Sequence, residues 1–503
     1  MADTKREIER KYESDESGLP DLTGVAGVRA VIDKGVANLD AVYYDTADER
    51  LAKASITLRR RTGGSDAGWH LKVPVAPGVR DEIREPLSDT VPRTLAGLVR
   101  SRVREAELLP VVRLRSDRDL RHLVDAEGVL LAEVSVDAVH AERLADDGGT
   151  AQWTEIEVEL ADDGDPVFLD KVEKRLRKAG VRPSSSASKL ARALAETAPK
   201  KAKKRKAPVP PPEPETAGDH VLAYVRDQRD AILELDPAVR QDAYDSVHRM
   251  RVATRRLRST FRSYGKVLDR TVTDPVGEEL RWLASELGVD RDREVMTERL
   301  TTVLAELPRT LVSGPVRTRM RTWANARRGG SRRRLIGVLD SKRYLALLDT
   351  LDALVAEPPL LPDAAGTPEK VIGKAVRKDF GKVSALVEEA IGAPPGADRD
   401  LALHEARKKA KRTRYAAEAA SPALGAPARG LAKSMKSLTS LLGEHQDSVM
   451  VRVTLRELSA VAHAAGESSF TYGVLYGREE QRAAAVEAAL PGMWEEIGSE
   501  VPV

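Results

Sequence analysis

The sequence predicts a multidomain α+β protein, with a β-rich N-terminal domain at residues 1–198 and an all-helical domain at 217–503. Before residue 198, short apolar runs separated by turn residues alternate at the two-residue period of strands. After residue 217, apolar residues recur every three or four positions, which is typical of amphipathic helices. Residues 199–216 are rich in Lys, Arg and Pro and hold almost nothing to bury, so we expect a solvated linker there.

Composition restricts the class of protein. The 503 residues suit two or three domains, and the absence of cysteine excludes disulfides, thiolate nucleophiles and iron–sulfur ligation. Because the 82 basic residues nearly balance the 79 acidic ones, the placement of charge along the sequence is more informative than the net charge. The sequence has no run of 18 apolar residues and its first residues are charged, so we expect a cytoplasmic protein without a membrane partner. No protein partner is implied.

The elements of the first domain follow in chain order. Period-two alternation predicts strands, and apolar residues at helical spacing predict helices between them. The helix that ends at Gly180 also has Pro183 beyond it, a usual stop signal. The strands are expected near 41–46, 56–64, 68–74, 130–139 and 153–160, and the helices near 94–105 and 168–180.

Two strands carry acidic residues on one face. Carboxylates stacked about 7 Å apart repel each other unless a cation neutralises them. Oxygen ligands of this kind suit Mg²⁺ or Mn²⁺ better than zinc. The acidic faces hold Glu7, Glu9 and Lys11 in the first strand and Glu155, Glu157 and Glu159 in the last.

Three other segments carry basic residues at the same period, namely Arg59, Arg61, Lys72, Arg113 and Arg115. If the sheet curls so that these faces meet, an acidic zone can hold metal and a basic zone can hold a polyanion. A metal-chelated triphosphate satisfies both zones. The alternative is that each strand has one solvated face, but charge at period two on five segments favours the ligand, since inward charge is costly without one.

These motifs together resemble the CYTH superfamily of triphosphate tunnel metalloenzymes. The ordered set is the N-terminal Glu-x-Glu-x-Lys, the Tyr-Tyr-Asp-Thr segment followed by LRRR, the WHLK strand and the late TEIEVEL strand. The superfamily includes thiamine triphosphatases, inorganic triphosphatases and class IV adenylate cyclases. The resemblance covers nearly all of residues 1–198 and implies an eight-stranded antiparallel β tunnel.

The resemblance also implies roles for individual residues. Glu7, Glu9, Glu157 and Glu159 would hold one or two divalent cations, Mg²⁺ or Mn²⁺, and Glu7, Glu9 and Lys11 would be the catalytic residues. The phosphates would be bound by Lys11, Arg59, Arg61, Lys72, Arg113, Arg115 and Lys189. Asp137 falls where the family often has an acid, and no role is assigned to Arg84, Arg118, Glu133 or Glu155.

The helical domain repeats itself. His248 and His404 each begin a pattern with basic residues at +3, +7 and +10, and the two histidines are 156 residues apart. A Leu-Gly segment follows each pattern, with Gly288 and Gly443 155 residues apart. Two pairs of motifs that agree within one residue indicate an internal duplication.

On a helix these offsets place the basic residues on one stripe. A solvated basic face explains one such helix, but two duplicated copies favour a shared polyanion site. The histidines are poor candidates for metal ligands, because neither stripe supplies a second histidine one turn away and the basic neighbours repel cations.

The two motifs resemble the CHAD domain, a conserved-histidine α-helical domain often fused to CYTH domains. The resemblance covers about 217–503 and implies two helical bundles related by pseudo-twofold symmetry, with a basic surface that binds inorganic polyphosphate. The ligand residues carried over by position are His248, Arg251, Arg255, Arg258, His404, Arg407, Lys411 and Arg414.

The sequence therefore favours metal-dependent hydrolysis of a short triphosphate by the first domain and polyphosphate binding by the second. One alternative is a non-catalytic polyphosphate-binding or targeting protein, and another is an adenylate cyclase. Nucleic acid is a less favoured partner, because aromatic residues that stack on bases are scarce near the basic helices. The interpretation is compatible with association with polyphosphate granules in the cytoplasm.

Overall fold

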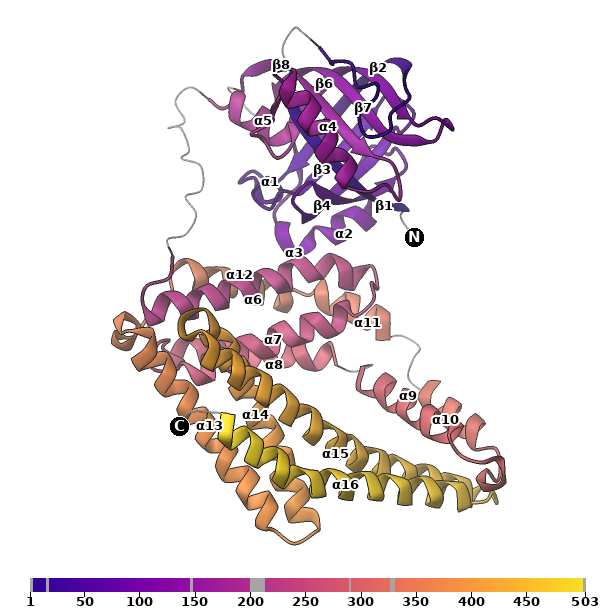
Figure 1. The fold of residues 1–503 in the computed structure, drawn as a ribbon, viewed down its shortest axis with the longest axis vertical. Coiled ribbons are helices and arrows are strands. Elements are labelled where there is room, and N and C mark those ends of the chain that lie inside the picture. The colour runs from indigo at the N-terminus through magenta and orange to yellow at the C-terminus, as the bar shows by residue number, and fades with distance from the viewer. Residues whose placement is uncertain are drawn as a thin grey trace. The chain divides into compact units, whose positions relative to one another are not determined.

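The computed structural model describes residues 3–14, 18–144, 148–199, 213–288, 291–325 and 331–500. The chain divides into two compact units, Met1–Pro210 and Pro211–Val503. The first unit is a β-barrel with short helices, and the second is all-helical (Figure 1). Most of the predicted linker, residues 200–212, lies outside the described residues.

Eight strands close the barrel. The sheet order is β5-β4-β3-β2-β6-β7-β8-β1, and β1 also pairs with β5, so the sheet closes on itself with antiparallel neighbours. A two-residue strand, β9, adds to the edge of β1. The strands are β1 (Asp3–Ser14), β2 (Ala30–Asp45), β3 (Thr57–Thr62), β4 (Gly68–Ala76), β5 (Val79–Glu85), β6 (Leu109–Val124), β7 (Leu130–Arg143), β8 (Thr150–Leu160) and β9 (Arg182–Pro183).

Alternation along the strands separates an apolar outer face from a charged interior. In β8, Ile156 and Val158 are buried under α4, where they share a core with Val172 and Leu176. The glutamates between them therefore face the barrel interior. The barrel helices are α1 (Arg50–Lys53), α2 (Arg93–Leu98), α3 (Arg100–Val103), α4 (Val167–Lys178) and α5 (Lys189–Glu196).

Helix α5 packs over one end of the barrel. Its Leu190 and Leu194 share an apolar core with Tyr43, Leu114 and Trp153 of the strands. Ser188 caps the helix by accepting a hydrogen bond from the Ala191 amide (3.1 Å). The first residue of the helix, Lys189, is thereby held at the edge of the barrel interior.

Two features differ from the sequence expectations. Strand β2 begins at Ala30, well before the expected strand at 41–46, and a register shift between Asp33 and Val36 includes Gly35 with φ +83°. A bulge of this kind interrupts the alternation that predicts a strand. The helix expected at 94–105 is two short helices, α2 and α3, separated at Val99.

The second unit contains the repeated motifs on long helices. Gly288 lies against Arg251, and Gly443 lies against Arg407. A Cβ at Gly288 would lie 2.6 Å from the nearest guanidinium atom of Arg251, and a Cβ at Gly443 would lie 3.2 Å from that of Arg407. The same contact in both halves supports the duplication. The elements are α6 (Ala217–Arg240), α7 (Ser246–Ser263), α8 (Arg270–Glu286), α9 (Arg291–Ala305), η1 (Arg309–Leu311), α10 (Val316–Asn325), α11 (Ser331–Leu339), α12 (Lys342–Ala356), η2 (Pro362–Ala365), α13 (Pro368–Gly392), α14 (Ala397–Leu424), α15 (Ala426–Ala464) and α16 (Phe470–Glu500).

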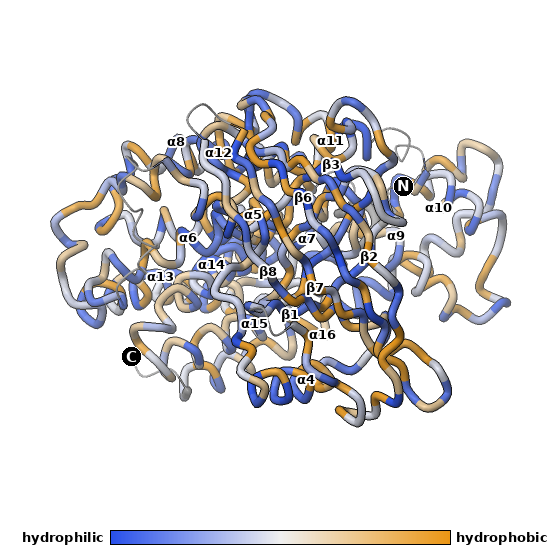
Figure 2. Tube along the Cα trace, turned by 90° about the horizontal axis from the view of Figure 1, so that it is seen from above, coloured by the Kyte–Doolittle hydropathy of each residue, from blue (hydrophilic) through white to orange (hydrophobic). Residues whose placement is uncertain are grey.

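Hydrophilic and hydrophobic residues intermix along the trace (Figure 2). None of the helices in the described ranges combines the length and apolar character that crossing a membrane requires.

Candidate active site and polyanion surface

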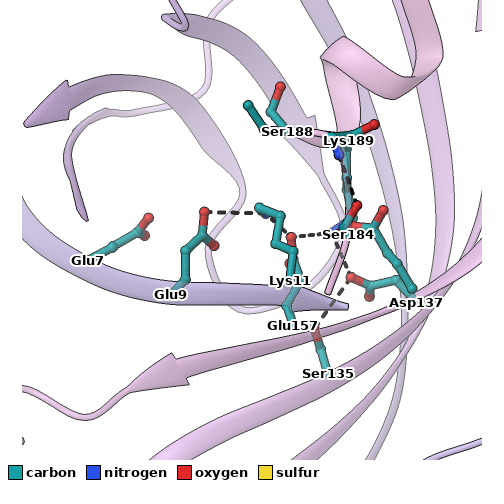
Figure 3. A network of polar contacts seen from close by, with 12 residues as sticks. Glu7, Glu9, Lys11, Ser135, Asp137, Glu157, Ser184, Ser188 and Lys189 are labelled. Atoms are coloured by element: carbon teal, nitrogen blue, oxygen red, sulfur yellow. Dashed lines mark hydrogen bonds and ion pairs between the residues drawn. The ribbon is translucent and has the colours of Figure 1, made fainter. Parts of the chain in front are cut away.

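The acidic residues of β1 and β8 meet inside the barrel. Antiparallel pairing sets Glu9 opposite Glu159 and Lys11 opposite Glu157. Glu7 and Glu9 follow one another along β1 and point to the same side (Figure 3), and both are buried. The strand register therefore brings the four predicted metal-binding glutamates onto two adjacent strands facing one interior.

Cations neutralise these carboxylates. Lys72 on β4 lies 2.5 Å from Glu7, and Lys11 lies 3.3 Å from Glu9 and also contacts Glu157. Although burial opposes ionisation, the ammonium groups of Lys11 and Lys72 hold the pKa of Glu9 below its usual value. The pKa of Glu157 is held well below its usual value in the same way, chiefly by Lys11.

Glu7 behaves differently. Burial raises the pKa of its carboxyl to about 7, and the nearby Glu82 and Glu159 contribute to the rise, although the ammonium of Lys72 opposes it. The acidic zone therefore combines a carboxyl with a raised pKa and carboxylates that stay ionised. Paired groups with opposed shifts are typical of catalytic carboxyls.

Lys189 occupies a second carboxylate cluster. Its Nζ lies 2.9 Å from Asp137 and 2.7 Å from both Glu155 and Glu157. Oxygen atoms of these three residues lie within 4.8 Å of one another, which is close enough to hold a metal ion. The Lys189 ammonium contacts all three of these carboxylates, just as Lys72 contacts Glu7 and Lys11 contacts Glu9 and Glu157. An all-oxygen donor set of this kind fits Mg²⁺ or Mn²⁺.

The cations form the other wall of the same cavity. Arg118 on β6 makes hydrogen bonds to Asp137 (2.7 Å) and Glu157 (2.9 Å), and Arg59 on β3 donates to the Tyr43 hydroxyl (3.3 Å). The cavity has about 450 Å³ of empty volume. It is lined by Glu9, Lys11, Tyr43, Thr57, Arg59, Lys72, Arg80, Arg118, Glu157, Glu159, Ser188 and Lys189.

Some predicted phosphate ligands are elsewhere. Arg113 and Arg115 lie on the outer face of β6, where Arg113 binds Asp40 (2.5 Å) and Arg115 lies 4.0 Å from Glu142. The inward residues of β6 have the opposite parity, so Arg118 is the cation that this strand gives to the cavity. Our placement of Arg113 and Arg115 in the basic zone is therefore corrected.

Arg61 is buried on β3, forms an ion pair with Asp66, and is not among the residues that line the cavity. Burial lowers the pKa of its guanidinium to about 9, with contributions from Arg59 and Arg118. Arg61 thus adds to the positive potential around Arg59 and Arg118, although it does not line the cavity.

Glu82 was missed by the sequence analysis. This buried residue of β5 accepts from Arg84 (2.5 Å) and lies near Lys72 (3.6 Å) and Arg59 (3.7 Å). Its strand has acidic residues at both parities, with Asp81 and Glu85 on one face and Glu82 on the other, so its inward face cannot be read from alternation. The Glu82 carboxylate therefore contacts the charged ends of Lys72, Arg59 and Arg84 and helps to position them.

In the helical unit, cations from both repeats gather where α7 and α14 pack together. Burial lowers the pKa of Lys411 to about 8, and Arg407, Arg255 and Arg251 contribute to the shift. Burial and Arg255 also lower the pKa of Arg407, although Asp447 opposes the shift. Among the residues that the structure describes, the buried Nε atoms of Arg255 and Arg407 have no hydrogen-bond partner. These four residues form a shared cluster of positive charge, which we call the basic cluster.

The other residues of the two stripes surround the basic cluster less closely. Arg258 is near Arg262 and Arg281, and its pKa is lowered mainly by burial. His404 makes a hydrogen bond with Gln446 (2.6 Å), and Arg414 binds Glu418 (2.8 Å) instead of joining the cluster. His248 lies half-buried in the first turn of α7.

The first unit is a closed barrel whose interior brings carboxylates and cations together, in a chain that also has a helical domain. The CYTH domain model matches residues 5–194, and the CHAD domain model matches residues 223–456. Uncharacterized proteins from two strains of Mycobacterium tuberculosis are 40% identical over 96% of this chain and 95% of their own length. The chain belongs to the family of proteins that combine a CYTH domain with a CHAD domain.

The comparison with solved structures also found similar proteins. PptA from Streptomyces chartreusis is 20% identical with a TM-score of 0.47, covering 56% of this chain and 100% of that one. The CHAD domain from the plant Ricinus communis is 23% identical with a TM-score of 0.45, covering 56% and 92%. A putative adenylyl cyclase from Hippeastrum, described as having a dominant triphosphatase activity, is 19% identical with a TM-score of 0.24, covering 38% and 96%.

Proposed function

We propose that the barrel hydrolyses inorganic triphosphate, or a related organic triphosphate, with Mg²⁺ or Mn²⁺, and that the helical domain binds inorganic polyphosphate. The observation that carries the first part is the cavity itself, in which Glu9, Glu157 and Glu159 share one small volume with Arg59, Arg118 and Lys72. A ligand that brings negative phosphates together with a divalent cation matches both walls.

Different residues of the barrel would bind the phosphates, hold the metal and accept the proton of the attacking water. Arg59, Lys72 and Arg118 bind phosphate oxygens and neutralise charge that repels an attacking water. Glu7, Glu9, Glu157 and Glu159 hold the metal, which supplies charge stabilisation at the reacting phosphoryl group. A tunnel glutamate accepts the proton of the water as its oxygen bonds to the terminal phosphorus. The bond to the bridging oxygen breaks, and the products are diphosphate and orthophosphate.

The test is Glu9→Gln, assayed by Mg²⁺-dependent release of orthophosphate from tripolyphosphate. We expect turnover to fall to background, because the amide keeps the shape but loses the charge that holds the metal. Glu142→Gln on the outer face of β7, whose carboxylate is half-exposed beside Arg115, is the matched control and should retain full turnover. Undiminished turnover in Glu9→Gln would remove the metal assignment.

The helical proposal is supported by the basic cluster. Arg251, Arg255, Arg407 and Lys411 come from both repeats, and burial together with the three arginines lowers the pKa of Lys411. Like charges held together in this way are relieved by a polyanion. Lys411→Gln should weaken binding of long-chain polyphosphate about tenfold at physiological salt. Competition with single-stranded RNA tests the partner, and tighter binding of RNA would contradict the polyphosphate assignment.

A further inference from the structure

A buried histidine in the helical domain lies between two carboxylates from two other helices. His445 on α15 is 1% exposed. Its Nε2 is 3.3 Å from Asp400 Oδ1 on α14 and 3.3 Å from Glu487 Oε1 on α16. The three atoms lie within 4.8 Å of one another. The trio belongs neither to the barrel cavity nor to the basic cluster.

Hydrogen bonding accounts for only one of these two contacts, because His445 Nε2 and Glu487 Oε1 are hydrogen-bonded at 3.3 Å. One imidazole nitrogen carries at most one proton, so Nε2 can donate to only one carboxylate at full strength. Hydrogen bonds between an ionised donor and a carboxylate are usually about 2.7–2.9 Å long, and both separations here exceed that range. The oxygens of Asp400 and Glu487 therefore lie at the same distance from Nε2, although its single proton can serve only one of them fully.

The remaining oxygen of each carboxylate faces an arginine. Arg399 Nη1 lies 2.7 Å from Glu487 Oε2, and Arg452 Nη2 lies 3.8 Å from Asp400 Oδ2. The arginines thus orient each carboxylate from outside and leave Oδ1 and Oε1 directed at the histidine. Outer partners that hold ligating side chains in this way are characteristic of metal centres.

The two nitrogen–oxygen separations of 3.3 Å also fit a metal. Nitrogen and oxygen ligands about 2.0–2.2 Å from a tetrahedral ion lie roughly 3.3–3.6 Å from each other. A cavity with about 430 Å³ of empty volume is lined by Glu487, together with Arg399, Leu403 and Leu490 among others, and reaches the trio on the Glu487 side.

We propose that Asp400, His445 and Glu487 bind a divalent transition-metal cation, Zn²⁺ or Mn²⁺, with water in its remaining positions. A neutral imidazole together with carboxylates favours these ions over Mg²⁺ or Ca²⁺, which prefer all-oxygen sites. This site is separate from the barrel metal site and depends on neither part of the proposed function.

The experiment uses the full-length protein with Mn²⁺ alone and detects imidazole nitrogen coupling by pulsed electron paramagnetic resonance. The all-oxygen barrel site gives no such coupling, so the readout separates the two sites. We expect ¹⁴N coupling in the wild type and in Glu9→Gln, and its loss in His445→Gln. His463→Gln, an exposed histidine of the same helix, is the matched control and should keep the coupling.

Asp400→Asn provides a second variant, because Asp400 is only half-buried and the substitution preserves side-chain shape. Equilibrium dialysis with Zn²⁺ should show the affinity of one site reduced about 10- to 100-fold, with the circular dichroism spectrum unchanged. The proposal is overturned if the wild type shows no ¹⁴N coupling at saturating Mn²⁺, if folded His445→Gln retains it, or if Asp400→Asn binds Zn²⁺ as tightly as the wild type.

Discussion

Two lysines, the buried Lys189 and the half-buried Lys411, illustrate how the barrel and the helical domain differ. Lys189 in the barrel lies within 2.9 Å of three carboxylates, and although burial opposes it, Asp137 and Glu157 raise its pKa. Lys411 in the helical domain has arginines as its main charged neighbours, and burial together with Arg407 lowers its pKa to about 8. The barrel interior is built from matched charges, whereas the basic cluster carries an excess of one sign.

This difference indicates what each region can bind. A cavity that already balances its charges accepts a ligand that also carries both signs, such as a metal-chelated triphosphate. A surface with unbalanced positive charge accepts a polyanion without a metal. The predictions that follow test whether the two regions separate in this way.

Metal removal should have the largest effect and should act on one region only. With excess EDTA, release of orthophosphate from tripolyphosphate should fall to background, because Glu9, Glu157 and Glu159 then face the substrate phosphates without the metal. The affinity for long-chain polyphosphate, measured by fluorescence anisotropy in the same buffer, should change less than about twofold. A loss of polyphosphate affinity in parallel with the loss of orthophosphate release would contradict the conclusion that only the barrel needs a metal.

Lys189→Ala should be the most destabilising substitution. It leaves Asp137, Glu155 and Glu157 buried and close together without their ammonium, and removing one partner of a buried ion pair costs about 3–5 kcal/mol. Differential scanning calorimetry should show an earlier transition of the barrel, partly restored by Mn²⁺ because the three oxygens can then hold a cation. Lys171→Ala, an exposed position on α4, should leave the transition unchanged.

Polyphosphate affinity should depend on pH through Lys411. Its ammonium is charged below a pKa of about 8 and neutral above it, so affinity should fall as the pH rises from 7 to 9. A Lys411→Arg variant keeps its charge over this range and should show a flatter profile. Equal slopes in the two proteins would show that Lys411 does not contact the ligand.

The smallest effect should come from the repeated glycines. A Cβ at Gly288 would lie 2.6 Å from the Arg251 guanidinium, whereas one at Gly443 would lie 3.2 Å from that of Arg407. Because the ends of arginine side chains can move, Gly288→Ala should leave stability nearly unchanged and weaken polyphosphate binding about threefold. Gly443→Ala should have a smaller effect, and the reverse order would argue against a role for the Arg251 position.

The sequence predicted the fold class well because alternation in β1 and β8 is regular. Apolar Ile156 and Val158 alternate with glutamates, so one face had to be charged. Strand β6 is different, because Arg113, Arg115 and Arg118 occupy both parities and only the closed barrel decides which of them faces inward.

Contacts between side chains on neighbouring strands also could not be predicted from the sequence. Glu82 and Lys72 lie on neighbouring strands and contact through the register of β4 and β5. The trio Asp400, His445 and Glu487 joins three helices whose packing no local pattern indicates. In each case the residue types were known from the sequence, but the strand register or helix packing that brings them together was not.

The most direct test of the central claim compares two arginines of the same strand. Arg118 faces the cavity and Arg113 faces outward, so Arg118→Gln and Arg113→Gln remove the same charge from opposite sides of β6. With Mg²⁺ and tripolyphosphate, we predict that kcat/KM falls at least about 100-fold in folded Arg118→Gln and stays within about twofold of the wild type in Arg113→Gln. Equal losses, or a larger loss in Arg113→Gln, would contradict a reaction inside the barrel.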